Sequence, residues 1–291
     1  MSALTSKIFS SIASITSFSL IIISRLVAAL GDEIASDAAK ELGYTFVTRH
    51  DIEKRIVELG FPKEKLEKYD ERKPGFFASL SKNRDEYLNY LQLAVIEAAS
   101  KGNCILIGRG AFAILEDVPG MIPIRLIAKD SIRIERLKKE FNWTEKQAMQ
   151  RIEESRNNRT GFHKDFFNIN HDDAQNYLMT LNTGILSREE CVKIIVQTAK
   201  SISTEHNECG EKILSQMLSC QELTNKLLYE YHMKIDFLRA VSNTEGTEIT
   251  LHGITDSQAT IEKAVNLAAK ILPSFSIKSA ICVTQDFKSF N

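Results

Sequence analysis

Short apolar runs alternate with helical patterns through the first two thirds of the chain, and this alternation constrains the fold more than any other feature. A run that is apolar throughout, rather than at every second position, is typical of a parallel strand that helices cover on both faces. Residues 44–47 are a plausible fifth strand beside four clearer ones. The four clearer runs are residues 19–24, 104–108, 124–128 and 177–181.

Helical patterns fill the intervals between these strands. Residues 32–42 and 84–101 are each followed by a glycine, the residue that most often ends a helix. Thr144 and Ser187 each precede a helical pattern and have Gln or Glu three residues later, which is the spacing of a capping box. Asp130 is a candidate cap for the helix that follows it. Strand and helix alternate through residue 203, which predicts a doubly wound α/β fold with a five-stranded parallel sheet.

The pattern changes after this region. Residues 205–233 are polar and apolar at helical spacing and contain no strand. Three strands and one helix follow, so the order is α-β-β-α-β, which predicts a small α+β domain. The strands are expected at 235–241, 248–251 and 276–283, and the helix at 256–272.

These patterns divide the chain into two predicted domains and a connector. The α/β domain covers 1–203, the helical connector 204–226 and the α+β domain 227–291. Residues 1–17 form an N-terminal extension whose apolar continuation has some features of a weak signal peptide. Serines interrupt that apolar stretch and it is short, which favours the first buried strand.

Composition excludes several classes of protein. Apolar residues make up 43% and charged residues 26% of the chain, as in globular proteins rather than collagen-like, disordered or membrane-spanning ones. The 37 basic and 38 acidic residues leave no basic field for nucleic acid. Five scattered cysteines without a C-x-x-C pair argue against disulfides and favour a reducing cytoplasm. The six histidines lack metal-ligand spacing, so we expect no metal held by protein side chains.

The turn after the first predicted strand is the first place to expect a ligand, because doubly wound sheets bind ligands beyond the carboxyl ends of their strands. It reads Ser24-Arg25-Leu26-Val27-Ala28-Ala29-Leu30-Gly31-Asp32-Glu33. A phosphate-binding loop needs several glycines and usually a lysine, whereas this turn has one glycine and no lysine. Taken alone, the segment is better explained as an ordinary strand-to-helix turn in which Asp32 and Glu33 favour the helix dipole.

Arginines gather at the other strand ends. Arg109 stands between two glycines after the strand at 104–108 and is expected to point into the crevice. Residues 125–159 hold ten basic and six acidic residues, a local charge of +4 in a neutral protein. Arginine suits phosphate because its planar fork binds two oxygens and stays charged. A solvated helix face is the alternative explanation. The helical pairs are Arg133 with Arg136 and Arg156 with Arg159.

Together these segments resemble the cytidylate-kinase-like family of P-loop nucleoside monophosphate kinases over roughly residues 18–203. No single motif is specific, but their order and spacing are. The motifs are Ile22-Ile23-Ser24-Arg25, Leu30-Gly31-Asp32-Glu33-Ile34-Ala35, Leu42-Gly43-Tyr44, Gly108-Arg109-Gly110, Arg133 with Arg136, Arg156-x-x-Arg159 and Leu181-Asn182-Thr183-Gly184-x-Leu186-Ser187.

The resemblance implies in-line phosphoryl transfer from ATP, with Mg²⁺, to CMP or a similar small acceptor. It also implies roles for particular residues. These are Ser24, Arg25, Ala28, Ala29, Leu30, Gly31, Asp32 and Glu33 at the ATP phosphates, Arg109, Arg133 and Arg136 at the acceptor, and Arg151, Arg156 and Arg159 in catalysis.

The loop departs from the family pattern. Members with an intact loop have a glycine-serine-glycine run where this chain has Ala28-Ala29-Leu30. Side chains there crowd the approach of a phosphate and disfavour positive φ. The alternative is therefore an inactive pseudokinase, a binding or regulatory protein for a nucleotide or other phosphate ligand.

The C-terminal region resembles a BON domain over about residues 227–285. The resemblance rests on Ile249-Thr250-Leu251-His252-Gly253, with Gly253 at the end of a strand, and on the helix and strand that follow. It implies binding of a ligand, a membrane surface or another protein. A packing or dimerisation module, and hence a homo-oligomer, is the alternative. Residues 69–80, the expected acceptor-binding region, carry no decisive polar pattern.

Overall fold

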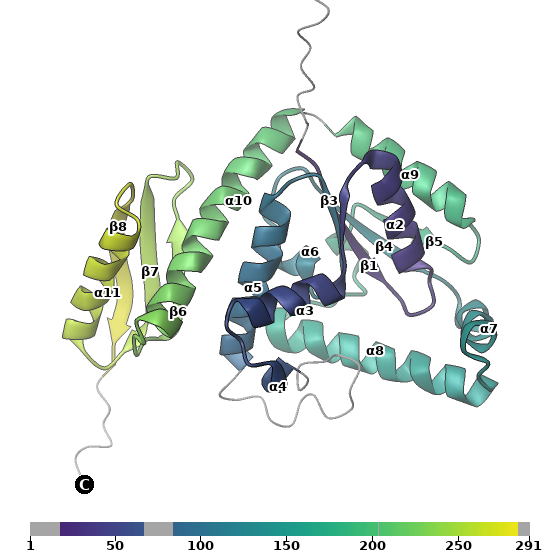
Figure 1. Cartoon of the computed structure of the whole chain (residues 1–291), viewed down its shortest axis with the longest axis horizontal. Coiled ribbons are helices and arrows are strands. Elements are labelled where there is room, and N and C mark those ends of the chain that lie inside the picture. The colour runs from purple at the N-terminus through teal and green to yellow at the C-terminus, as the bar shows by residue number, and fades with distance from the viewer. Residues whose placement is uncertain (1–17, 67–83, 203, 285–291) are drawn as a thin grey trace, which may run out of the picture.

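The computed structural model describes residues 18–66, 84–202 and 204–284 (Figure 1). The N-terminal extension predicted at 1–17 and the acceptor-binding region predicted at 69–80 lie outside these residues.

A parallel sheet of five strands forms the centre of the larger unit. The strand order is β2-β3-β1-β4-β5, and every pairing is parallel. This confirms the predicted sheet, although β4 begins earlier and β5 later than the apolar runs indicated. The strands are β1 (Leu20–Arg25), β2 (Thr45–Val47), β3 (Cys104–Ile107), β4 (Met121–Ile127) and β5 (Met179–Asn182).

Helices cover both faces of this sheet. Leu20 and Ile22 of β1 pack on one face, and Ile21 and Ile23 pack on the other, all fully buried. Because successive side chains of a strand point to opposite faces, two covering layers require the uninterrupted apolar run. One layer is α2 (Gly31–Leu42) and α9 (Arg188–Ser201), and the other includes α3 (Arg49–Glu58), α5 (Arg84–Ser100), α6 (Ala111–Ile114) and α8 (Glu145–Phe167).

A helical hairpin, α7 (Asp130–Phe141) followed by α8, extends beyond the carboxyl edge of the sheet (Figure 1). The predicted capping box at Thr144 is present, with its hydroxyl accepting from Gln147 N–H at 3.4 Å. The predicted cap at Asp130 is wrong. Lys129 occupies the N-cap position without a side-chain bond, and the Asp130 carboxylate instead binds Arg133 and Arg156.

The C-terminal unit has the predicted order α-β-β-α-β. In its three-stranded sheet, β6 and β7 are antiparallel while β7 and β8 are parallel. The elements are α10 (Thr204–Asn225), a π-helical turn (Lys226–Glu230), β6 (Asp236–Ser242), β7 (Glu248–Thr255), α11 (Gln258–Ile271) and β8 (Ser276–Val283). The short helix α4 (Lys63–Leu66) belongs to the larger unit, where it follows α3.

One strand end in this unit was predicted wrongly. Gly253 does not end a strand but lies inside β7, opposite Ile281 of β8. The strand continues past it because pairing with β8 extends to Thr255. The likeness to a BON domain therefore loses one of its supporting features and stays a prediction.

Helix α10 packs against both α5 and β6, and lies between the two sheets in Figure 1. Asn89 of α5 donates to the Tyr229 hydroxyl at 2.9 Å, and Tyr90 stacks on Tyr229 at 4.9 Å between ring centroids. The boundaries expected at residues 203 and 226 stay predictions. No helix in the described ranges is long and apolar enough to cross a membrane.

Candidate functional site

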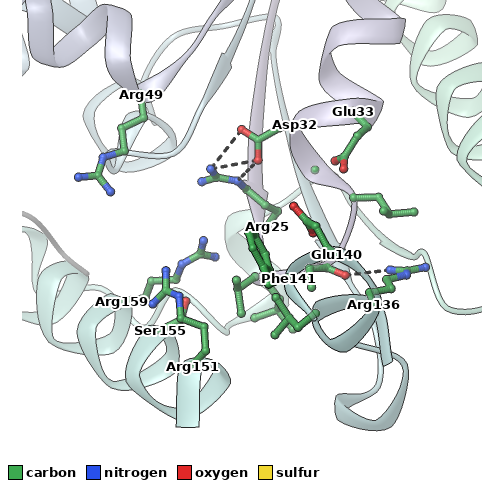
Figure 2. Close-up of a pocket in the computed structure, with 16 residues that line it drawn as sticks. Arg25, Asp32, Glu33, Arg49, Arg136, Glu140, Phe141, Arg151, Ser155 and Arg159 are labelled. Carbon is green, nitrogen blue, oxygen red and sulfur yellow. Dashed lines mark hydrogen bonds and ion pairs between the residues drawn. The ribbon is translucent and has the colours of Figure 1, made fainter. Parts of the chain in front are cut away.

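A cavity of about 440 Å³ opens at the carboxyl edge of the five-stranded sheet (Figure 2). It lies between the loop after β1, the first turn of α2, and helices α3, α7 and α8. Its charged lining is mainly cationic, and all of the cations are arginines. These are Arg25, Arg49, Arg136, Arg151 and Arg159, against the acids Asp32, Glu33 and Glu140.

The loop after β1 adopts a conformation that its residues disfavour. Ala28 and Leu30 have φ of 58° and 57°, in the left-handed region that glycine enters without strain. Tertiary hydrogen bonds hold the loop there: Leu26 N–H donates to Leu126 O at 3.0 Å, and Arg136 donates to Ala28 O at 3.0 Å. The side chains at 28 and 30 disfavour positive φ, as predicted, but both residues adopt it, so the turn carries backbone strain.

The loop leads directly into the first turn of α2. Ile34 makes the first backbone bond of this helix, to Leu30 O at 3.0 Å. Within the described part of the chain, the N–H groups of Gly31, Asp32 and Glu33 therefore meet no backbone acceptor. Such groups carry the positive end of the helix dipole and favour an anion.

An ion pair lies across this helix start. The Arg25 guanidinium contacts the Asp32 carboxylate at 3.3 Å, and Arg25 passes so close to Gly31 that a Cβ there would lie 2.4 Å from its side chain. Asp32 is 61% exposed, so solvent screens the pair. The carboxylate at the helix start therefore lies beside a cation of the site, in a pair that solvent weakens.

Arg109 is placed differently from the prediction. Gly108, Arg109 and Gly110 are all left-handed, and this turn buries the Arg109 guanidinium against Glu53 of α3 rather than pointing it into the cavity. The Tyr87 hydroxyl lies 3.4 Å away. Burial, followed by the nearby charges of other arginines, lowers the pKa of Arg109.

Two further residues of the site, Glu53 and Arg49, were not predicted from the sequence. Arg49 Nε donates to Glu53 at 2.6 Å, so this carboxylate joins Arg49, which lines the cavity, to the buried Arg109. The available signal was local. Thr48 and Asp51 form a capping box that begins α3, and Arg49 and Glu53 are four residues apart on it.

The two arginines of α7 bind the loop itself. Arg136 donates to Ala28 O and to Thr183 O, the latter at 2.6 Å, and so joins the loop to the end of β5. Arg133 is 2% exposed and donates to Asp130 at 2.5 Å and to Val27 O at 3.4 Å. Arg136 lines the cavity and Arg133 does not, so the structure brings one of them to the site.

Helix α8 continues through residue 167 and carries the three predicted catalytic arginines. Arg151 and Arg159 line the cavity on the side opposite Arg136 (Figure 2). Arg156 is turned toward Asp130, at 2.8 Å, and lines a smaller adjoining space of about 120 Å³ with Arg159. The hydrogen bond from Arg133, then the charge of the same residue and the contact with Arg156, lower the pKa of Asp130.

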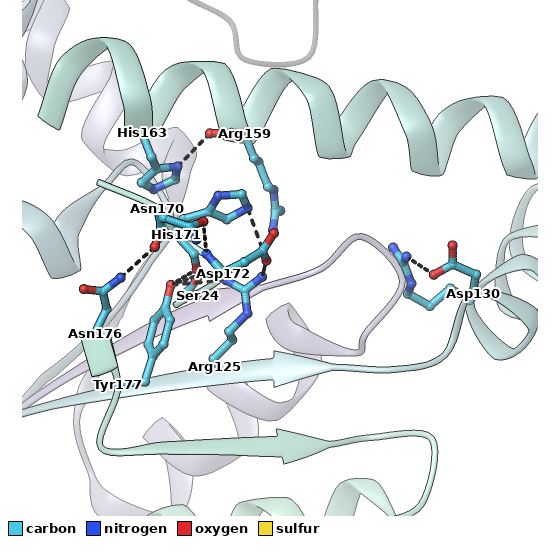
Figure 3. Close-up of polar contacts among 11 residues, drawn as sticks. Ser24, Arg125, Asp130, Arg159, His163, Asn170, His171, Asp172, Asn176 and Tyr177 are labelled. Atoms are coloured by element: carbon cyan, nitrogen blue, oxygen red, sulfur yellow. Dashed lines mark hydrogen bonds and ion pairs between the residues drawn. The ribbon is translucent and has the colours of Figure 1, made fainter. Parts of the chain in front are cut away.

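A buried polar network supports the end of α8 (Figure 3). Arg125 of β4 donates to His171 O at 2.5 Å and to the Tyr177 hydroxyl at 3.2 Å, and pairs with Asp172. His171 stacks on His163 at 5.0 Å, and His163 Nδ1 contacts Arg159 O at 2.9 Å. Burial lowers the pKa of His171 to about 4. The network holds the turn of α8 that carries Arg159. Its signal in the sequence was Arg125, a charged residue inside the apolar run of β4.

Comparisons with known proteins give a family and a fold. A model of the cytidylate kinase-like family matches residues 20–185, which is more than half of the chain. An uncharacterized protein from Eubacterium ventriosum is 16% identical, with a TM-score of 0.50, over 63% of this chain and 99% of its own. Shikimate kinase from Acinetobacter baumannii is 14% identical over 67% and 97% of the two chains, with a TM-score of 0.38. No curated protein matches the sequence.

Proposed function

Because the chain belongs to the cytidylate kinase-like family, we propose that its larger unit transfers a phosphoryl group from ATP to CMP or a similar small acceptor. The observation that carries this proposal is the cavity of about 440 Å³ in which arginines from β1, α3 and α8 converge beside the start of α2. Phosphoryl transfer needs mainly positioning and positive charge at the transferring group. Arginines supply both, because each can bind two phosphate oxygens.

The residues present fit the phosphates of ATP in part. The N–H groups of Gly31, Asp32 and Glu33 and the side chains of Arg151 and Arg159 would hold them. Bound with ATP, Mg²⁺ would neutralise phosphate charge. The nucleotide phosphates would supply most of its oxygen ligands, as is usual for Mg²⁺ at kinase sites.

The acceptor would lie on the α3 side of the cavity. Arg49 lines this side, and Glu53 links it to Arg109. An acceptor phosphate would bind Arg49 directly, while Arg109 would hold the Glu53 carboxylate in place. Arg133 and Arg136 would keep the loop in its left-handed turn.

Turnover tests the proposal. The full chain is incubated with ATP, Mg²⁺ and each nucleoside monophosphate, and the nucleoside diphosphates are separated and quantified. We expect formation of CDP or another nucleoside diphosphate, and a loss of kcat of about 100-fold or more in Arg159→Ala. Lys164→Ala, an exposed substitution on the same helix, serves as the control and should retain wild-type turnover. Absence of turnover in the wild-type protein contradicts phosphotransfer.

The Arg25–Asp32 pair favours a second candidate, a nucleotide-binding protein that transfers nothing. This contact places a carboxylate at the helix start and occupies an arginine of the site. The BON-like unit would then respond to occupancy through α10, which contacts both units. Saturable binding of ATP·Mg²⁺ without formation of ADP would support this candidate over the first.

A further inference from the structure

The last turn of α7 gives one part of the cavity a different chemistry from the rest. Glu140 and Phe141 line it there, and both project from α7 toward the loop and Arg25 in Figure 2. Arg151 and Arg159 lie on the other side, on α8. The acid at 140 repels phosphate, so a ligand with a charged and an uncharged end would place its charged end at α8.

Phe141 is the aromatic residue of the cavity lining, and it is 49% exposed. Its ring stacks on Trp143, with centroids 4.7 Å apart and planes inclined by 25°. The cluster that joins α7 to α8 consists instead of Leu137, Ala148 and Ile152. Phe141 therefore contributes little to the packing of the hairpin, while Trp143 supports its ring from one face.

We propose that Phe141 is the platform on which the base of the nucleotide stacks, with the phosphates extending to the arginines of α8. This rests on the proposed function, because it places the base of the same ligand. An aromatic ring accepts any base on its π face, and such stacking contributes roughly 5- to 150-fold in affinity. A volume of about 440 Å³ is within the range of small-molecule sites.

The nearby guanidinium is not an alternative platform. Arg136 is also on α7 and lines the cavity, but it donates to Ala28 O, Thr183 O and the Thr183 hydroxyl. These bonds orient its plane toward the loop and the end of β5. Phe141 is the aromatic side chain that the lining offers for stacking.

The test compares a ligand that has a base with one that lacks it. ATP·Mg²⁺ and tripolyphosphate are each titrated into the full chain by calorimetry. Phe141→Ala should weaken ATP binding about 10-fold or more and leave tripolyphosphate binding unchanged, whereas Phe141→Tyr should retain ATP affinity. Met149→Ala removes another exposed apolar side chain from the hairpin, 53% exposed, and should change neither affinity.

The outcomes separate this inference from the proposed function. Unchanged ATP affinity in Phe141→Ala overturns base stacking while the phosphate site stands. Equal losses for ATP and tripolyphosphate also overturn it, because they show a change in the arginine site. If the wild-type protein binds neither ligand, the proposed function fails and the stacking proposal fails with it.

Discussion

Replacing Ala28 with glycine should stabilise the protein, which is the opposite of the usual effect of this substitution. Ala28 has φ of 58°, where a residue with a Cβ is strained and glycine is not. Ala29 is the matched control, because it lies in the same loop, is 1% exposed and is absent from the residues with positive φ.

The two expected changes have opposite signs. A left-handed residue with a Cβ costs about 1–2 kcal/mol, and glycine costs about 0.4–1 kcal/mol through the greater freedom of the unfolded chain. Ala28→Gly should therefore raise the free energy of unfolding, by up to about 1.5 kcal/mol. Ala29→Gly relieves no strain and removes a buried methyl group, so it should lower the free energy by about 1–2 kcal/mol.

Urea unfolding followed by tryptophan fluorescence measures both changes. Trp143 is the single tryptophan of the chain, and it packs against the same small cluster as Ala28. The expected result is a higher urea midpoint for Ala28→Gly and a lower one for Ala29→Gly, with unchanged slopes. Equal destabilisation by both substitutions would refute the argument that the loop stores strain at Ala28.

Three further predictions concern buried polar groups and the joint between the units. Glu53→Ala should destabilise by about 3 kcal/mol in the same urea assay, because it leaves Arg109 buried without its carboxylate, whereas exposed Glu58→Ala should cost less than about 1 kcal/mol. The pKa of His171, about 4, lies below its unfolded value of 6.5, so the unfolded chain binds the proton more tightly. The free energy of unfolding is therefore unaffected by this group above pH 6.5 and falls as the pH decreases toward 4. Between pH 7 and pH 4, the free energy of unfolding should fall by up to about 3 kcal/mol less in His171→Phe than in the wild-type protein, as unfolding curves at the two pH values would measure. Asn89→Ala removes the bond to the Tyr229 hydroxyl, in the turn after α10, and the acceptor of the Gln221 side chain of α10. Hydrogen exchange should therefore be faster at the C-terminal end of α10 and in this turn, and unchanged in α2.

The elements that could be predicted are those specified by local pattern. The apolar run at β1 required two covering layers, and Ile21 and Ile22 are buried on opposite faces as expected. The capping boxes at Thr144 and Ser187 fixed helix starts, since they depend on residues three positions apart. Arg151 and Arg159 reached the cavity because α8 continues without interruption.

The parts that could not be predicted depend on contacts between distant residues. Arg109 turns from the crevice to Glu53, which is 56 positions away in the sequence. Ala28 adopts a backbone conformation that its own side chain disfavours, because hydrogen bonds from Arg136 and to Leu126 of β4 hold the loop. Phe141 lines the cavity only because the hairpin brings the end of α7 over the loop.

Equilibrium titration of ATP·Mg²⁺ into the wild-type chain and Arg159→Ala tests most directly whether the arginine cavity is a phosphate site. Saturable binding to the wild-type protein is expected, weaker by about 10-fold or more in the variant, since charged hydrogen bonds each contribute about 1.5–3 kcal/mol. Raising the salt concentration should weaken wild-type binding, because phosphate and arginine attract through charge. Binding that is absent, or that is as tight in Arg159→Ala as in the wild-type protein, would contradict the account.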